Sequence, residues 1–257
     1  MKKILNILIN LFQKRYFFQM LNKIFLMFFD KKPKLSNDEN LRKINQLKIS
    51  AEDFLKNIDN NLYNEAIIET DKIIKNSDLE TNIYKNIKFG GNYALEIHYF
   101  LSRYYKPKII FETGVAAGYS SYTFLQAIEK NNIGKLFSSD FPYFRLENPE
   151  QYIGIVVPND LKKNWRLEVL GDNKNFEKFR YEFDKINFLF YDSDKRYLSK
   201  KKFFKKIDKY INKDTIIIID DLHNDSFFFE YIEEKSINKW YILESKRNHI
   251  VGLILVD

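Results

Sequence analysis

From residue 108 to the end of the chain, short apolar segments alternate with longer amphipathic ones. The apolar segments have the length and composition of β-strands, and they are residues 108–112, 135–140, 166–170, 186–191 and 215–220. Two of the intervening segments, 120–130 and 199–212, are typical of helices. Strands that alternate with helices pack as a parallel sheet with helices on both faces. This pattern predicts a doubly wound α/β domain over residues 106–257.

Two further apolar segments, 240–243 and 250–256, predict a pair of antiparallel strands that closes the sheet. The expected fold is therefore α/β and Rossmann-like. It has a mostly parallel, seven-stranded sheet with a C-terminal antiparallel hairpin, and an N-terminal helical extension. Within the extension, residues 36–105 are expected to pack on the core, with helices at about 37–57 and 60–76.

Residues 1–35 predict a basic amphipathic arm, because residues 1–30 mix many apolar residues with lysines and an arginine. The longest uncharged run falls well short of the roughly 20 residues that a membrane span requires. No small-residue cleavage site of a signal peptide is present. The arm either makes peripheral contact with an anionic membrane surface or packs as a helix on the domain or on the second subunit of a homodimer. Both interpretations remain open at this point.

The chain has no cysteine and only three histidines. These counts exclude disulfides, Cys-ligated zinc, iron–sulfur clusters, thiol nucleophiles and His-rich metal sites. Any metal would therefore be a hard cation bound by carboxylates. The net charge of +7 is spread along the chain and forms no stripe with interleaved aromatic residues. We expect a small-molecule partner and no nucleic acid. The expected location is the cytoplasm, at the inner face of the membrane if the arm binds lipid.

A glycine-containing loop, FETGVAAGYSS at residues 111–121, follows the first predicted strand. In an open parallel sheet, this is where nucleotide-like ligands bind. The loop lacks the lysine of a P-loop and the close-set glycines of a dinucleotide site. Glu112 would repel a pyrophosphate but suits a ligand with a positive amino group, and Asp140 could accept hydrogen bonds from both hydroxyls of a ribose. S-adenosylmethionine combines these two features.

Three further carboxylates stand at the ends of the next predicted strands. Asp192 follows the segment 186–191, and Asp220 and Asp221 follow the isoleucine run at residues 216–219. The carboxyl ends of these strands should face the same crevice as the glycine loop. Like charges a few ångströms apart raise each other's pKa. A cation with oxygen ligands, such as Mg²⁺ or Ca²⁺, would relieve this repulsion.

The loop ETGVAAGYSS, followed by Asp140, resembles the cofactor loop of class I S-adenosylmethionine-dependent methyltransferases. Its form E-x-G-V-x-x-G-Y-S resembles the O-methyltransferases of the caffeoyl-CoA type, and the likeness covers about residues 90–257. The resemblance implies S-adenosylmethionine as the cofactor. The residues that it implies for cofactor binding are Glu112, Gly114, Gly118, Ser120, Asp140 and Asp172.

The segment DSDK, residues 192–195, resembles an acidic motif of the cation-dependent O-methyltransferases. This resemblance implies Asp192, Asp220 and Asp221 as ligands of Mg²⁺ or Ca²⁺, with Lys195 near the substrate hydroxyl. The sequence departs from the family in having Asp221 where Asn is common, and in lacking the glycine pair usual before the fifth strand. A site without metal, in which Asp192 acts alone, is the alternative.

The expected reaction is an in-line transfer of a methyl group from the sulfonium to a substrate oxygen, so the protein must align the reactants and manage one proton. Asp192, Lys195 or His223 would take this proton. His223 is preferred to His98 and His249 because it lies directly beyond the fifth strand.

The expected acceptor is a hydroxyl of a small molecule, because a metal between carboxylates suits adjacent hydroxyls, as in a sugar or a catechol. A sugar or glycan precursor is favoured because a membrane-surface arm would suit an enzyme of envelope-polysaccharide assembly. Two alternatives stay open. One is a metal-independent methyltransferase on another acceptor, including nucleic acid, and the other is a non-catalytic membrane-associated protein that keeps the fold.

Overall fold

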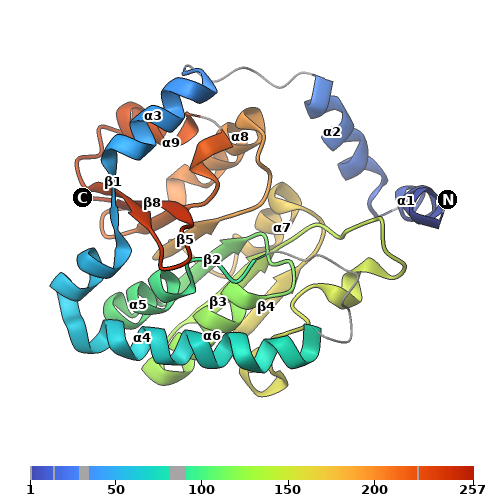
Figure 1. The fold of residues 1–257 in the computed structure, drawn as a ribbon. Coiled ribbons are helices and arrows are strands. Elements are labelled where there is room, and N and C mark those ends of the chain that lie inside the picture. Colours follow the sequence, from blue (N-terminus) through green and yellow to red (C-terminus); the bar gives the residue numbers. More distant parts are fainter. Residues whose placement is uncertain (1, 14, 29–34, 82–90, 225) are drawn as a thin grey trace.

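The computed structural model describes residues 2–13, 15–28, 35–81, 91–224 and 226–257 (Figure 1). The strands within these residues are β1 (Lys48–Ser50), β2 (Ile109–Thr113), β3 (Lys135–Ser139), β4 (Trp165–Glu168), β5 (Phe188–Tyr191), β6 (Ile216–Ile219), β7 (Trp240–Glu244) and β8 (Ile250–Leu255). They form one eight-stranded sheet in the order β1-β7-β8-β6-β5-β2-β3-β4. Neighbouring strands are parallel except at β8, which runs antiparallel to both β6 and β7.

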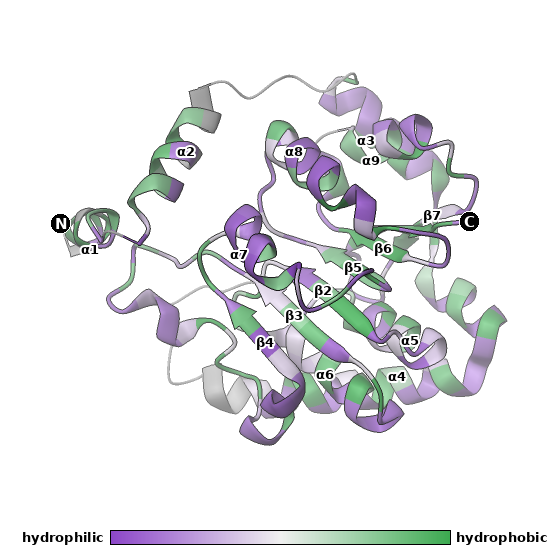
Figure 2. Ribbon diagram, turned by 180° about the vertical axis from the view of Figure 1, so that it is seen from behind, coloured by the Kyte–Doolittle hydropathy of each residue, from purple (hydrophilic) through white to green (hydrophobic). Residues whose placement is uncertain are grey.

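Helices cover both faces of the sheet (Figure 1). One face carries α4 (Ala51–Thr81), α5 (Leu95–Tyr105) and α6 (Tyr119–Asn131), and the other carries α3 (Asn37–Leu47), α7 (Asp172–Phe179), α8 (Tyr197–Ile207) and α9 (Phe227–Glu234). Alternate strand residues enter the two cores. Phe188 and Phe190 pack with the first group of helices, and Leu189 and Tyr191 pack with the second. Burial on both faces explains the continuous apolar runs of the central strands (Figure 2).

The predicted α/β fold is confirmed, with all seven expected strands and the antiparallel β7–β8 hairpin present. The expected number of strands is wrong by one, because β1 adds an eighth. β1 is parallel to β7, with Ile49 opposite Leu243. It also interrupts the segment 37–57, which was predicted to be a single helix. Periodicity within a local window cannot report this strand, because it is stabilised by pairing with a segment near the other end of the chain.

The predicted break between the helices at 37–57 and 60–76 is present as a kink inside α4. Asp59 has non-helical backbone angles, with φ −158° and ψ 102°. Its side-chain Oδ1 accepts a hydrogen bond from the backbone N–H of Leu62 at 2.9 Å. This contact is that of a residue capping the following helical segment.

The N-terminal arm consists of two helices, α1 (Lys2–Leu11) and α2 (Phe17–Phe28), which lie to one side of the sheet (Figure 1). Tyr16, between the two helices, is buried. No helix in the part of the chain that the structure describes is both long and apolar enough to cross a membrane. Residues 29–34, the end of the predicted arm, lie outside the described residues.

The order of strands reverses at β2 and β5, which lie side by side at the middle of the sheet. From this pair, β3 and β4 extend to one side and β6, β8 and β7 to the other. In open α/β sheets, ligands bind beyond the carboxyl ends of the strands at such a switch point. Gly114, Asp140, Asp192 and Asp220 directly follow β2, β3, β5 and β6 and therefore lie along this edge.

Candidate active site

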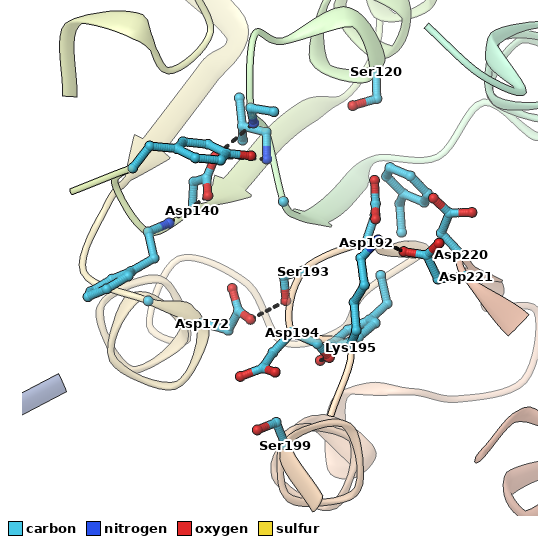
Figure 3. Close-up of a pocket in the computed structure, with 18 of the residues that line it drawn as sticks. Ser120, Asp140, Asp172, Asp192, Ser193, Asp194, Lys195, Ser199, Asp220 and Asp221 are labelled. Atoms are coloured by element: carbon cyan, nitrogen blue, oxygen red, sulfur yellow. Dashed lines mark hydrogen bonds and ion pairs between the residues drawn. The ribbon is translucent and has the colours of Figure 1, made fainter. Parts of the chain in front are cut away.

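A crevice of about 780 Å³ opens along the carboxyl ends of β2, β3, β5 and β6 (Figure 3). Small-molecule and cofactor sites usually have volumes of roughly 300–1,000 Å³. The predicted site residues that line this crevice are Gly114, Gly118, Ser120, Asp140, Asp172, Asp192, Lys195, Asp220 and Asp221. Among the described residues, the two predicted positions outside its lining are Glu112 and His223. The structure therefore brings most of the predicted cofactor and metal positions into one space.

The glycine loop packs directly on the end of β5. Gly114 has φ +83°, in the left-handed region that favours glycine, and a Cβ atom there would lie 1.8 Å from the carbonyl oxygen of Asp192. Gly118, with φ +99°, precedes the first turn of α6, and a Cβ there would lie 2.8 Å from the Cα of Gly154. The two glycines let the loop turn tightly, so that the N-terminal turn of α6 lines the crevice.

Asp140 holds the loop through three backbone contacts. Its Oδ2 accepts hydrogen bonds from the N–H groups of Val115 and Ala116 at 3.1 and 2.7 Å, and its Oδ1 accepts one from Phe141 at 2.6 Å. Burial raises the pKa of Asp140 to about 6, against the opposing effect of these hydrogen bonds. A carboxylate has about four lone-pair sites, so this arrangement leaves Oδ1 able to accept one ribose hydroxyl rather than the pair expected from the sequence.

Glu112 lies behind the loop. It is fully buried, and its carboxylate accepts hydrogen bonds from the hydroxyls of Ser120, Ser121 and Ser138, each at 2.6 Å. Burial raises the pKa of Glu112 to about 7, although the three hydroxyls act to lower it. From the sequence, Glu112 was expected to contact the ligand. In the structure its direct role is to orient Ser120, which does line the crevice.

Glu112→Gln should stabilise the ligand-free protein at pH 8 more than at pH 5. The pKa of Glu112 rises from 4.5 to about 7 on folding. Its contribution to stability is therefore fully present below about pH 4.5 and is lost as the pH rises through about 7. A glutamine side chain at this position is uncharged at every pH, so it avoids the cost of burying a charge above pH 7. Thermal unfolding followed by circular dichroism at the two pH values measures the difference. Glu129→Gln, at an exposed ion pair with Lys163, is the control, and an equal gain for Glu112→Gln at both pH values would contradict the assignment.

Three carboxylates converge at the other end of the crevice. One oxygen from each of Asp192, Asp220 and Asp221 lies within 4.8 Å of the other two. Burial raises the pKa of Asp192 well above its usual value, and the charges of Asp220 and Asp221 raise it further. Lys195 offsets part of this repulsion, because its Nζ lies 2.5 Å from Oδ2 of Asp221.

The histidine nearest to this cluster is not the one preferred from the sequence. His249, in the turn before β8, contacts Oδ1 of Asp220 through Nε2 and lines the crevice. The ring of Tyr93 stacks on it, with the centroids 5.0 Å apart and the planes at 15°. Burial acts to raise the pKa of Asp220, but the hydrogen bond and charge of His249 outweigh burial and hold that pKa below its usual range. His223, the preferred candidate, is more than half exposed and lies 3.8 Å from Asp221.

Strand register contains the signal that would have indicated His249. β8 pairs antiparallel with β6, and Gly252 is the partner of Ile219. Continued by one residue, this register places Val251 opposite Asp220, and His249, two residues before Val251, points to the same face of the sheet. The sequence predicted both strands and their hairpin, but not the register between β8 and β6.

Asp172 connects the ends of β3 and β5. Its Oδ1 accepts a hydrogen bond from the hydroxyl of Ser139 at 2.7 Å, and its Oδ2 accepts one from the hydroxyl of Ser193 (Figure 3). Asp172 is the first residue of α7. An acidic side chain near the N-terminus of a helix is electrostatically favourable, so its position on the crevice wall is well defined.

Known proteins resemble the same part of the chain. A family model described as a methyltransferase domain matches residues 111–222, from β2 to just beyond β6. No curated protein matches the chain significantly.

Solved structures with similar folds extend over more of the chain. A candidate O-methyltransferase from Klebsiella pneumoniae is 15% identical with a TM-score of 0.52, and the match covers 73% of this chain and 89% of that one. The O-methyltransferase from Bacillus cereus, solved in complex with SAH, is 13% identical with a TM-score of 0.52 and coverages of 72% and 90%. A methyltransferase from Geobacter sulfurreducens is 14% identical, with a TM-score of 0.50 and coverages of 72% and 89%.

At these identities the structural likeness shows a shared fold, and the match to the methyltransferase domain model rests on the sequence itself. The model spans the glycine loop and the acidic cluster, both of which line the crevice. The expected methyltransferase domain is thereby confirmed: residues 111–222 match a methyltransferase domain model, and the chain has the fold of solved methyltransferases, in agreement with the resemblance to the class I S-adenosylmethionine-dependent enzymes.

Proposed function

We propose that the protein is an O-methyltransferase that acts on a hydroxyl of a small molecule, such as a sugar or glycan precursor, with the help of a divalent cation. The observation that carries this proposal is the convergence of Asp192, Asp220 and Asp221 in the same crevice as the glycine loop. The Klebsiella pneumoniae protein of similar fold is named as a candidate O-methyltransferase. The Bacillus cereus protein is named as an O-methyltransferase and was solved with SAH. The proposed place of action is the cytoplasm, where cells make S-adenosylmethionine.

The crevice suits a ligand with the shape and charges of S-adenosylmethionine, which supplies the activated methyl group when bound. Asp140 would accept a hydrogen bond from a ribose hydroxyl at Oδ1, and Ser120 would face the amino acid end of the ligand. The close approach of Gly114 to the backbone at Asp192 places the loop edge beside the acidic cluster. The two ends of the crevice can therefore present donor and acceptor to each other, as an in-line transfer requires.

The three carboxylates fit a hard cation. Mg²⁺ binds oxygen at about 2.0–2.1 Å and Ca²⁺ at about 2.3–2.6 Å, so two ligands of one Ca²⁺ ion lie at most about 5.2 Å apart. The spread of 4.8 Å therefore fits Ca²⁺ directly and Mg²⁺ after a small contraction. A cation there would lower the pKa of an acceptor hydroxyl. Asp192, in the same cluster, is the carboxylate that would receive the proton, whereas Lys195 is already protonated in its ion pair with Asp221 and would stabilise the developing negative charge on the acceptor oxygen.

Lys195 also supports a second candidate function. Its ammonium group already lies 2.5 Å from Asp221 and compensates part of the negative charge without a metal. A metal-independent methyltransferase on another acceptor would use this ion pair to hold the acceptor hydroxyl. The two candidates differ in one property that can be measured, which is the requirement for a divalent cation.

The metal requirement can be tested without knowing the acceptor. Mn²⁺ is a paramagnetic substitute for Mg²⁺ and should bind the wild-type protein at one site. Binding is measured as a decrease in the electron paramagnetic resonance signal of the unbound ion. Asp220→Asn should weaken this binding by at least about tenfold, within the range of 10–100-fold usual when partners of a metal site are removed. Asp160→Asn, on the exposed surface, is the matched control. Undiminished Mn²⁺ binding by Asp220→Asn, or none by the wild type, would favour the metal-independent candidate.

Transfer itself is measured with radiolabelled S-adenosylmethionine and a panel of sugars, nucleotide sugars and catechols. We expect label in at least one hydroxyl acceptor, lost in EDTA and restored by Mg²⁺ or Ca²⁺. Full activity in EDTA would exclude the metal-assisted reaction. Label that appears only in nucleic acid would contradict the proposed class of acceptor.

A further inference from the structure

The N-terminal arm exposes an unusual amount of apolar surface. Among the described side chains of α1, α2 and their connection, the large apolar ones exposed by 40% or more are those of Ile4, Leu5, Ile9, Phe12, Phe18, Leu21, Ile24 and Phe25. Phe12 and Phe18 are both more than 70% exposed. Single exposed apolar residues are common on protein surfaces, but so many of them on two helices consecutive in the chain indicate a partner.

These exposed residues repeat at helical spacing. Leu5, Ile9 and Phe12 follow one another at intervals of four and three residues on and just after α1, and Phe18, Leu21 and Phe25 do so on α2. Residues at such intervals lie on one face of a helix. Each helix of the arm therefore presents a coherent apolar face to solvent.

The opposite side of the arm is attached to the loop after β3. The side-chain amide of Asn10 donates to the carbonyl oxygens of Phe144 and Leu146 at 3.3 and 3.1 Å. Tyr16 is fully buried, with its ring centroid 5.0 Å from that of Phe144, and its hydroxyl contacts the carboxylate of Glu150. The arm is thus held in one orientation with its apolar faces outward.

The arm and the loop that holds it both border the crevice. Ile7, Gln19, Met20 and Asn22 of the arm line it, as do residues 141–145 of the loop. These arm positions lie between the exposed apolar residues in the sequence, as expected if each helix has one face toward the crevice and one toward solvent. Whatever surface the arm binds will therefore lie next to the mouth of the crevice.

The charge of the arm indicates which surface this is. Residues 1–29 contain no aspartate or glutamate, but they contain lysines and an arginine. An apolar helix face combined with basic residues is typical of helices that lie in the interface of an anionic bilayer. Two copies of this arm facing each other would instead bring like charges together, which disfavours a dimer through the same surface.

We propose that residues 2–28 dock on an anionic lipid bilayer and hold the mouth of the crevice at the level of the lipid headgroups. The apolar faces of α1 and α2 enter the interface, and the net positive charge of residues 1–29 attracts the arm to anionic headgroups, although Arg15 itself pairs with Glu150. The fixed attachment at Asn10 and Tyr16 carries this orientation to the rest of the protein. The proposal concerns binding and orientation, so it does not depend on the acceptor or on the metal.

Docking is tested by sedimentation with vesicles. The full chain should sediment with vesicles of phosphatidylglycerol and phosphatidylcholine in equal parts, and far less with phosphatidylcholine alone. High salt should weaken binding, because it screens the basic residues. A triple variant, Ile9→Ser with Phe12→Ser and Phe18→Ser, should weaken binding by at least about tenfold. Ile68→Ser, at an exposed position of α4, should leave binding unchanged.

Orientation is tested with fluorescent dyes attached to introduced cysteines. The wild-type sequence has no cysteine, so each dye reacts at one chosen position. A dye on Arg145→Cys, beside the arm and the crevice, should be quenched by spin-labelled lipid in the anionic vesicles, whereas a dye on Ile68→Cys should not. The proposal is overturned if the wild-type protein stays in solution with anionic vesicles, or if both dyes are quenched alike. It is also overturned if analytical ultracentrifugation shows a dimer that the triple variant converts to a monomer. Calorimetry with S-adenosylhomocysteine on the same samples reports cofactor binding separately, so failure of the proposed function would be seen independently.

Discussion

Gly114→Ala should abolish measurable binding of S-adenosylhomocysteine, with a loss in affinity of at least about 100-fold, or about 2.7 kcal/mol. The added Cβ would lie 1.8 Å from the carbonyl oxygen of Asp192, which is a backbone atom and cannot turn away. The loop would have to leave the end of β5, and the contacts of Asp140 with the N–H groups of Val115 and Ala116 would be lost with it. Isothermal titration calorimetry measures the affinity directly.

The control for this substitution is Gly171→Ala. Gly171 also has positive φ, at +88°, but the nearest atom to an added Cβ is a carbon of the Phe141 ring at 3.4 Å, an ordinary contact. Both positions have positive φ, but only an alanine at Gly114 would clash with a backbone atom. Gly171→Ala should lose less than about tenfold in affinity. Equal losses in the two variants would mean that strain, and not the packing of the loop on β5, explains the result.

Asp192→Asn should reduce methyl transfer by about 100-fold or more while leaving the affinity for S-adenosylhomocysteine within about threefold of wild type. Burial and the charges of its two neighbours raise the pKa of Asp192, which makes it a stronger base than an exposed carboxylate. Asparagine keeps the shape but cannot take the proton or contribute a negative charge to a cation. The effect should appear in kcat.

Single-turnover assays with radiolabelled S-adenosylmethionine, together with calorimetry on the same preparation, separate the two effects. Asp160→Asn, on the exposed surface, serves as the control and should keep full activity. Loss of cofactor affinity in Asp192→Asn would place this residue in the donor subsite instead. Unchanged transfer would remove it from the reaction.

Much of the fold could be predicted from the sequence because each central strand contains a short apolar run and is followed by an acidic residue or a glycine. Parallel strands place their carboxyl ends at one edge, so the positions of Gly114, Asp140, Asp192 and Asp220 along the chain are sufficient to assign them to a common crevice. Local patterns were sufficient here because the alternation of strands and helices implies that these strands are parallel.

The features that were missed depend on register or on distant pairing. β1 is a strand only because β7 lies beside it. His249 reaches Asp220 because of the register between β6 and β8. Glu112 belongs to the same face of β2 as Ile110, which packs under α6, so its carboxylate turns toward the serines of that helix and away from the crevice. The alternation of side chains along β2 would have indicated this position for Glu112.

The central claim is that one crevice holds the methyl donor and the acidic cluster side by side. A crystal structure with S-adenosylhomocysteine and Mn²⁺, with anomalous data collected at the manganese edge, tests it most directly. The expected result is the cofactor's ribose at Asp140, its sulfur directed toward Asp192, and an anomalous peak between Asp192, Asp220 and Asp221. A cofactor bound away from the glycine loop, or a sulfur separated from the carboxylates by protein, would contradict the claim.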